Sequence, residues 1–448
     1  MTRRTIREWE HISYGAGETE IAEAQADRLA AVARASVFSG RGGEGVLEHG
    51  RRGLRARGVV GVVATPDCQL EILPKIEGGS ETRVSDATLR ARLIHMLAVT
   101  YDLPIEAAAM TQLDWQHETV LELLIRLFCA KLTDAVRQGM PRQYLEHEKD
   151  LPSLRGRLNV TRQFSRLAVS PQKLACRFDA LSPDTALNRV MRAAISKLLR
   201  MSGEPHNQRA LRELKFAYAD VVDVPPNALR WDQIVLDRTN RRWRDLLSLA
   251  RLFLLDRHQQ TGGGTIDGHA LLFEMNILFE KYIERVLSRA LVGTSFRVSS
   301  QGGNRSCLYE GDIGLFRTRP DIIIRQGDEV VLIIDTKWKR MTPRIDDPKQ
   351  GVSQADVYQL MAYGRLYHCP NVVLLYPHHG DLPPDPICQR YSIATNEAHE
   401  KLIVATQDLT GTQRSHKDAL RKLVRNCLDH EIKLKAHNKH GEQLFDTV

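Results

Sequence analysis

Two aspartates and a lysine in the last third of the chain have the types and spacing that could do chemistry. Asp321 ends an Arg-Pro-Asp sequence and opens one expected strand, whereas Asp335 and Lys337 lie near the end of the next, VVLIIDTKW. Because side chains alternate along a strand, Asp335 and Lys337 share one face. The short connection QGDE (326–329) turns the chain back. We therefore expect both carboxylates and the lysine to converge at one end of a sheet.

This combination is suited to holding a divalent cation. A carboxylate that follows the apolar run VVLII is costly unless it is paired or binds a metal. Two carboxylates at short range repel each other, and oxygen ligands with open water positions suit Mg2+ or Mn2+. Such an ion stabilises the charge that develops in phosphodiester cleavage, and Lys337 could orient or deprotonate the attacking water. We interpret Asp321, Asp335 and Lys337 as a candidate nuclease site, although a DxK pair alone is more often a surface ion pair.

One glutamate could complete the metal site. Glu280 lies in LFEKY, on a helix expected at 269–293, and could reach the ion held by the two aspartates. Glu274 or Glu284 of the same helix could take this role instead, and Glu280 would then be an ordinary helix residue.

A second helix could support the lysine. Gln359 and Tyr363 stand four residues apart within an expected helix at 353–368, so they share one helix face. That face could hold the site lysine or touch a nucleic acid backbone. Simple packing is the alternative for both side chains.

The elements that must position these residues follow one another in an α/β order. We expect helices at 269–293 and 353–368, and strands at 311–316, 321–326, 330–338 and 371–377. This order indicates helices layered on one central sheet. A last helix, expected at 414–430, precedes a polar tail.

The chain before these elements divides into two parts. Residues 1–105 are expected to be mixed α+β, with helices at 21–35 and 88–104 and two strands within 57–76. Residues 106–265 are expected to be mostly helical, with helices at 117–139, 182–203 and 241–258. The sequence QQTGGGT (259–265) is typical of a flexible hinge. We therefore predict four parts, at 1–105, 106–265, 266–410 and 411–448.

The positive charge of the chain is concentrated in the middle region. The 448 residues carry 63 Lys and Arg against 55 Asp and Glu, and residues 106–265 hold 25 of the basic and 18 of the acidic side chains. Residues 151–178 contain six basic and no acidic residues, and RTNRRWR (238–244) adds four arginines. Such patches suit phosphate contacts. A solvated face, or a face docked on an acidic protein, is equally compatible with them.

Composition and missing motifs exclude several function classes. No apolar run reaches the roughly 20 residues of a membrane helix, and the start MTRRTIREWEHISYG has no apolar secretion signal. Seven scattered cysteines form no CxxC pair, which argues against a disulfide scaffold or a zinc finger. GxxxxGK[ST], HExxH and GxSxG do not occur. We expect a cytoplasmic protein without a membrane partner and without its own nucleotide-binding loop.

With these residues in view, the sequence resembles the PD-(D/E)xK nuclease superfamily. More narrowly, it resembles the McrC family, the nuclease subunits of McrBC-type modification-dependent restriction systems. Five stretches carry the resemblance: LEILPKI (70–76), LRGRLN (154–159), SPDTALNRVMRA (182–193), FEMNILFEKYIE (273–284), and RPDIII through LIIDTKWKR to DVYQLMAY (319–363).

The resemblance implies a fold, a site and a set of partners. The fold would be an α/β C-terminal PD-(D/E)xK nuclease domain behind a mixed α+β N-terminal domain and a mostly helical middle region. Asp321, Asp335 and Lys337 would be catalytic in cutting double-stranded DNA with Mg2+. The partner would be an McrB-like AAA+ GTPase ring that binds GTP and reads the methylcytosine-type base, docks on residues 1–105 and is stimulated by this chain. Dimerisation through the nuclease domain is compatible with this scheme.

Two other functions remain open at this point. A stand-alone RecB-like repair nuclease would cut without a nucleotide and without a ring partner. A non-catalytic activator would use the nuclease fold only as a scaffold, but the presence of both aspartates and the lysine argues against that. A gene for an AAA+ GTPase beside this one would favour the restriction system.

Overall fold

The computed structural model describes residues 2–35, 46–75, 84–103, 118–170, 172–238, 240–255, 268–303, 305–341, 351–393 and 401–442, and in the last helix side chains up to residue 428. The expected hinge at 259–265 lies outside the described residues. No helix within the described ranges is long and apolar enough to cross a membrane.

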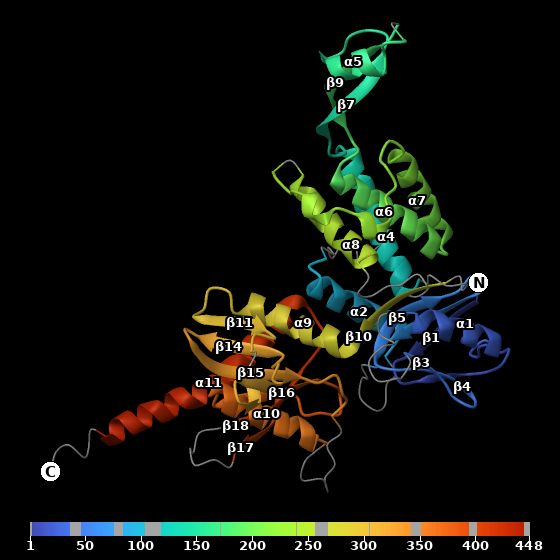
Figure 1. Cartoon of the computed structure of the whole chain (residues 1–448). Coiled ribbons are helices and arrows are strands. Elements are labelled where there is room, and N and C mark those ends of the chain that lie inside the picture. Colours follow the sequence, from blue (N-terminus) through green and yellow to red (C-terminus); the bar gives the residue numbers. More distant parts are fainter. Residues whose placement is uncertain are drawn as a thin grey trace.

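A six-stranded mixed sheet forms the centre of the C-terminal part (Figure 1). Its strand order is β11-β14-β15-β16-β18-β17, in which β15, β16 and β18 run parallel and the other neighbours are antiparallel. The strands are β11 (Phe296–Ser300), β14 (Ile322–Gln326), β15 (Glu329–Thr336), β16 (Asn371–Pro377), β17 (Ile387–Ser392) and β18 (Lys401–Gln407). The predicted strands at 321–326, 330–338 and 371–377 are confirmed.

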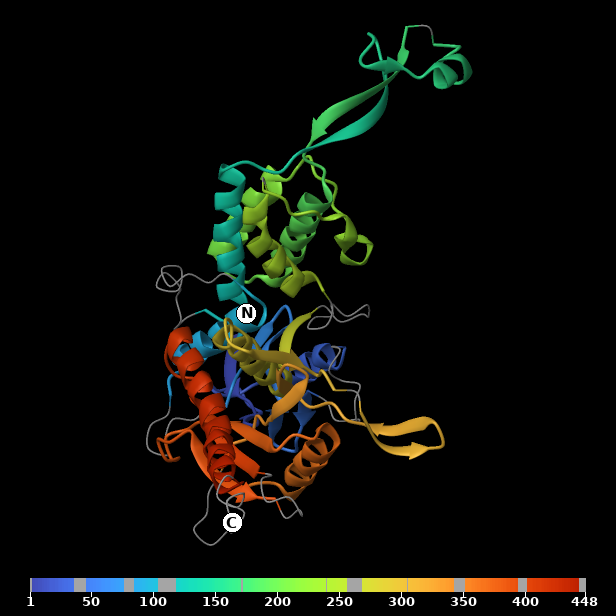
Figure 2. The same ribbon diagram turned by 90° about the vertical axis from the view of Figure 1, so that its left-hand side faces the viewer.

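Helices cover both faces of this sheet, which is why its central strands are apolar on both sides. Helix α10 (Gln354–Tyr367) packs on one face, and α9 (Met275–Ala290) and α11 (Gln413–Glu442) pack on the other. A separate hairpin, β12 (Ser306–Glu310) and β13 (Ile313–Arg317), projects from this part of the molecule (Figure 2). The predicted helix at 353–368 is confirmed.

The N-terminal part contains two small sheets. The first has the order β1-β6-β5-β10 and the second the order β2-β4-β3. Their bounds are β1 (Thr2–Arg7), β2 (His11–Ser13), β3 (Leu47–His49), β4 (Gly53–Ala56), β5 (Val59–Ala64), β6 (Cys68–Leu73) and β10 (His269–Glu274), with helices α1 (Glu23–Arg34) and α2 (Asp86–Thr100). The two strands predicted within 57–76 and the helices at 21–35 and 88–104 are confirmed.

Strand β10 corrects one prediction. A single helix was expected at 269–293, but His269–Glu274 is a strand that pairs antiparallel with β5, and the helix begins only at Met275. The run ALLF is apolar without interruption, and periodicity cannot distinguish a short buried strand from a buried helix. The valine-rich β5 offers an open edge, and pairing with it decides the outcome. A strand that follows the expected hinge therefore belongs to the N-terminal sheet.

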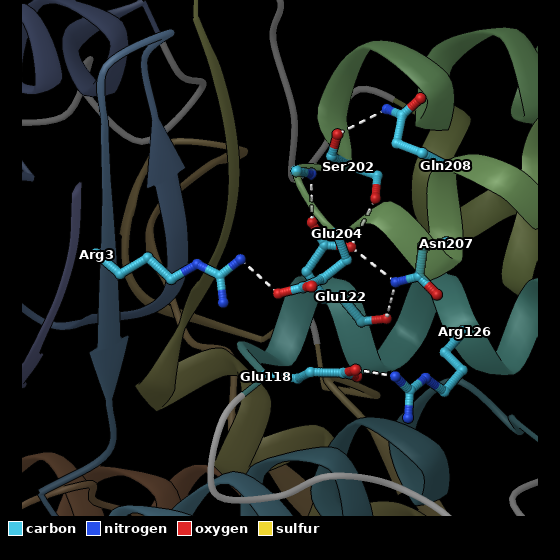
Figure 3. A network of polar contacts seen from close by, with 9 residues as sticks. Arg3, Glu118, Glu122, Arg126, Ser202, Glu204, Asn207 and Gln208 are labelled. Carbon is cyan, nitrogen blue, oxygen red and sulfur yellow. Dashed lines mark hydrogen bonds and ion pairs between the residues drawn. The ribbon is translucent and has the colours of Figure 1, made fainter. Parts of the chain in front are cut away.

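The described residues of the middle region pack α4 (Val120–Arg137), α6 (Ala186–Met201), α7 (Pro205–Ala217) and α8 (Arg244–Leu254) together, with short 3-10 turns η2 (Pro226–Ala228), η3 (Trp231–Gln233) and η4 (Arg241–Trp243). A buried carboxylate joins three of their segments (Figure 3). Glu122 accepts hydrogen bonds from Ser202 Oγ at 2.7 Å and Asn207 Nδ2 at 2.8 Å. Beside it, Arg3 of β1 pairs with Glu204, so the N-terminal sheet and the helices are in direct contact.

A β-ribbon extends far from the helices (Figures 1 and 2). We call it the arm; it comprises β7 (Gln143–Leu151), β8 (Arg157–Leu158), α5 (Val160–Ser165) and β9 (Leu174–Ser182). The expectation of a mostly helical middle region does not include these strands. Because no core lies beneath β7, its sequence QYLEHEKDL lacks the apolar alternation that predicts a strand.

Candidate active site

The strand pair β14–β15 brings the two aspartates together. Ile322 and Ile334 are partners in the register, so Asp321 and Asp335 follow at the same end of the pair. Asp321 Oδ2 accepts hydrogen bonds from the backbone N–H and the hydroxyl of Thr336, both at 2.8 Å. Asp335 is 1% exposed. Two carboxylates therefore lie side by side where a fully apolar strand reaches the edge of the core.

Lys337 lies against the same cluster. Its ammonium Nζ is 2.6 Å from Asp335 Oδ2 and donates to Gln359 Oε1 at 3.4 Å. Gln359 Nε2 in turn donates to the Tyr363 hydroxyl at 2.6 Å, and that hydroxyl donates to the carbonyl of Arg319 at 3.4 Å. The structure thus brings Gln359 and Tyr363 to the lysine, on the face of β15 that α10 covers. Tyr363 also ties α10 to the Arg-Pro-Asp segment.

Asp356 is a site residue that the sequence analysis misses. It lies one turn before Gln359 on α10, it is 8% exposed, and its carboxylate is 3.8 Å from Lys337 Nζ and 3.3 Å from Lys339 Nζ. Its spacing of three residues from Gln359 was the available signal, since i and i+3 share a helix face.

Glu280 approaches the cluster from α9 on the other side of the sheet. Its Oε1 accepts a hydrogen bond from Gln301 Nε2 at 3.1 Å. The pKa of Glu280 is raised to about 7, chiefly by burial and then by the charges of Asp321 and Asp335, whereas the Gln301 bond opposes the shift. Glu284 Oε1 instead accepts a hydrogen bond from Ser288 Oγ at 3.0 Å, and Glu274 is the N-cap residue of α9 without a side-chain capping bond. The charges of both aspartates act on Glu280.

Negative charge is concentrated at this end of the sheet. Burial raises the pKa of Asp335 to about 6, assisted by Asp321 and opposed by Lys337. Burial also raises the pKa of Asp321, against the two bonds from Thr336. For Lys337 burial favours the neutral form, but Asp335, Asp356 and Asp321 outweigh it and raise its pKa. The carboxylates therefore need a positive partner, and the lysine keeps its proton.

The oxygen donors of the site suit a hard cation, but they are not yet gathered around a single metal position. Within the described ranges, no three His, Cys, Asp or Glu side chains already stand at metal-binding distances from one another. Neither Asp321 nor Asp335 accepts a hydrogen bond at Oδ1 from a described residue, so each keeps one oxygen for a ligand. Glu280 is turned toward Gln301 and would have to swing in. Oxygen donors alone suit Mg2+ or Mn2+ better than zinc.

The comparisons with known proteins point to one and the same family. The sequence model described as McrBC 5-methylcytosine restriction system component matches residues 54–377. The type IV methyl-directed restriction enzyme EcoKMcrBC of Escherichia coli (strain K12) is 22% identical over 259 residues, which cover 54% of this chain and 72% of that protein.

Two solved structures from Thermococcus gammatolerans are similar to this fold. A half-complex from a tetradecameric assembly of McrB AAA+ hexamers with bound McrC matches with a TM-score of 0.69 and 22% identity, and the match covers 94% of this chain and all of that one. The McrBC complex determined by cryo-EM matches with a TM-score of 0.51 and 25% identity, over 65% of this chain and 88% of that one. The mixed α/β architecture is therefore shared along most of the chain.

Proposed function

Because the chain belongs to the family of McrBC 5-methylcytosine restriction system components, we propose that it is the nuclease subunit of such a system. The observation that carries this proposal is the cluster of Asp321, Asp335 and Lys337 at one end of the sheet, with Asp335 buried and Lys337 held 2.6 Å from it. In this proposal the C-terminal sheet and its helices form a PD-(D/E)xK nuclease domain. The substrate is double-stranded DNA that carries a methylcytosine-type base.

Asp321 and Asp335, with Glu280 as a third ligand, would hold Mg2+, and Mn2+ could replace it. When bound, the ion would neutralise the carboxylates and stabilise charge on the phosphate oxygens. Lys337 keeps its proton because three aspartates raise its pKa, so its role is to donate to a phosphate oxygen or to the attacking water, not to remove a proton. Gln359, with Tyr363 behind it, holds the lysine in that position.

The partner in this proposal is an McrB-like AAA+ GTPase ring. The similar Thermococcus structure contains McrB AAA+ hexamers with bound McrC, and this sequence has no GxxxxGK[ST] loop of its own. GTP would therefore be bound by the partner, and a cytoplasmic location would follow from that task. A pair of such complexes, joined through two nuclease domains, would place one site on each DNA strand.

Two surfaces are candidates for docking the ring. Residues 1–105 are the region expected from the resemblance. The arm is the second candidate, because it projects from the body and carries large exposed apolar side chains such as Tyr144, Phe164 and Val169, which are 74%, 75% and 88% exposed. A protein partner that covered the arm could bury these apolar side chains.

A cleavage assay tests the proposed function. Methylated and unmethylated plasmids are incubated with Mg2+ and the full chain, with and without its genomic AAA+ neighbour and GTP. We expect cutting of the methylated plasmid only when partner and GTP are both present, and no cutting by Asp335→Ala with GTPase stimulation retained. Cutting by the chain alone would instead indicate a RecB-like repair nuclease. Wild-type cutting by Asp335→Ala would refute the site, and GTPase stimulation without any cutting would indicate an activator.

A further inference from the structure

Trp338 connects the candidate site to the N-terminal sheet. It follows Lys337 directly and lies on the opposite face of the chain, where its ring packs against Phe279 with centroids 5.3 Å apart. Its indole N–H donates to Glu8 Oε2 at 2.8 Å. Glu8 follows β1, so this single bond joins residues 330 positions apart in the sequence.

Glu8 is itself rigidly placed. It is 1% exposed, and its backbone N–H donates to the carbonyl of Leu73 at 2.8 Å, which continues the β1–β6 pairing. The next residue, Trp9, has a positive φ of 70° and its N–H donates to Ala56 at 2.9 Å. The backbone that carries this carboxyl is therefore held by the N-terminal sheet.

Packing alone does not hold the indole in place. A cavity of about 260 Å3 lies beside the pair, lined by Glu8 and Trp338 together with Lys75, Pro377 and His378 among others. Space of this size allows a half-buried side chain to reorient if its polar bond is lost. The hydrogen bond to Glu8 is therefore the polar contact that orients the indole beside this cavity.

We propose that Glu8 is a positioning residue for the nuclease site, acting through Trp338. The indole fixes the end of β15, which carries Lys337, and through Phe279 it supports the first turns of α9, which carry Glu280. One carboxyl of the N-terminal sheet thereby helps to position two groups of the site, which lie on opposite faces of the C-terminal sheet. This inference rests on the proposed function, because it assigns Lys337 and Glu280 to the same reaction.

The buried carboxyl of Glu8 is not the side chain that would stabilise the fold most at this position. Burial raises its pKa to about 7, although the bonds from Trp338 and Trp9 favour the ionised form. An amide of the same shape would keep an acceptor for the indole without the charge, so Glu8→Gln should fold at least as well as the wild type. Positioning and folding can therefore be separated by experiment.

The test uses the full chain in complex with its AAA+ partner and GTP. Cleavage rate is measured against Mg2+ concentration for Glu8→Ala, Glu8→Gln, Trp338→Phe and the double variant Glu8→Ala/Trp338→Phe. We expect Glu8→Ala and Trp338→Phe each to lower the rate, or to raise the half-saturating Mg2+ concentration, on the order of tenfold. The double variant should be no worse than either single one, because both remove the same bond. Glu8→Gln should restore near-wild-type values.

Two controls separate this role from a general structural one. Glu204→Ala removes another contact of the N-terminal sheet, the pair with Arg3, and should leave the Mg2+ dependence unchanged. The indole resonance of Trp338, assigned by its loss in Trp338→Phe, should shift in Glu8→Ala and return in Glu8→Gln. This readout and the melting temperature do not depend on cleavage.

The outcomes distinguish the two proposals. If Asp335→Ala is inactive while Glu8→Ala and Trp338→Phe cut like the wild type at every Mg2+ concentration, the positioning role is wrong and the nuclease proposal stands. If Glu8→Gln is as defective as Glu8→Ala at an unchanged melting temperature, the hydrogen bond is not the cause and the inference is overturned. Trp338→Phe keeps the test valid if Glu8→Ala does not fold.

Discussion

Asp335→Asn should make the metal-free protein more stable while it abolishes cleavage. The pKa of Asp335 is raised from 3.8 to about 6, chiefly by burial and then by Asp321. A rise of about 2 units corresponds to about 3 kcal/mol of unfavourable free energy once the carboxylate is ionised in the folded state. Because the folded pKa lies above the unfolded one, this penalty is missing below about pH 4 and complete above about pH 6.

This penalty is already a net value, because Lys337, with its Nζ 2.6 Å from Asp335 Oδ2, opposes the rise in the pKa of Asp335. The neutral amide removes the penalty, and the lysine keeps Asp356 at 3.8 Å. The expected gain is therefore about 3 kcal/mol at pH 7.5, or several degrees in melting temperature.

Thermal melting in EDTA at pH 7.5 and pH 4.5 measures this difference. We expect Asp335→Asn to melt higher than the wild type at pH 7.5, with a smaller gain at pH 4.5. Asp312→Asn, in the exposed turn between β12 and β13, is the matched control and should change neither value. Mg2+ should raise the melting temperature of the wild type but not that of Asp335→Asn. An equal or lower melting temperature for Asp335→Asn at pH 7.5 would show that its partners stabilise the carboxylate, and would refute the reasoning from burial.

Three further predictions address the lysine, the third ligand and the arm. Lys337→Ala should lower the cleavage rate about 10²–10³-fold while calorimetry still detects Mg2+ binding; an unchanged rate would remove the lysine from the mechanism. Glu280→Gln should raise the Mg2+ concentration needed for half-maximal cleavage, with Glu284→Gln on the same helix as its control, and equal shifts in both would exclude a ligand role. Phe164→Ser should weaken stimulation of the partner's GTPase at an unchanged melting temperature. Full stimulation would leave 1–105 as the docking region.

The sequence was sufficient for the parts of the site that depend on local geometry. Alternation along β15 places Asp335 and Lys337 on one face, and the four-residue spacing on α10 places Gln359 and Tyr363 together. Asp356 required knowledge of which face of α10 meets the strand. Glu8 could not be predicted, because its contact with Trp338 arises only when the N-terminal sheet packs on the C-terminal one.

The two errors in the fold have the same physical origin. Periodicity reports how a segment is buried, not which element it pairs with. Strand β10 is buried on both faces, so it gives the uninterrupted apolar run that a buried helix also gives. Strand β7 has no fully buried residue, so its sequence gives no clear apolar pattern. In both cases the partner strand, β5 or β9, determines the conformation.

The N-terminal sheet, the middle helices and the C-terminal sheet share one apolar core, and this limits which segments of the chain can be deleted. One cluster of buried apolar side chains extends from Val60 of the N-terminal sheet, through the middle helices, to Phe279 and Ile334 beside the candidate site. A fragment cut at 266 would begin with β10 but would have lost β5, so an apolar strand edge would be exposed. It would also have lost Glu8, and with it the bond that places Trp338. The proposed nuclease chemistry is therefore expected to require the N-terminal sheet even where the ring partner is not involved. Point substitutions thus test docking more cleanly than deletion of 1–105.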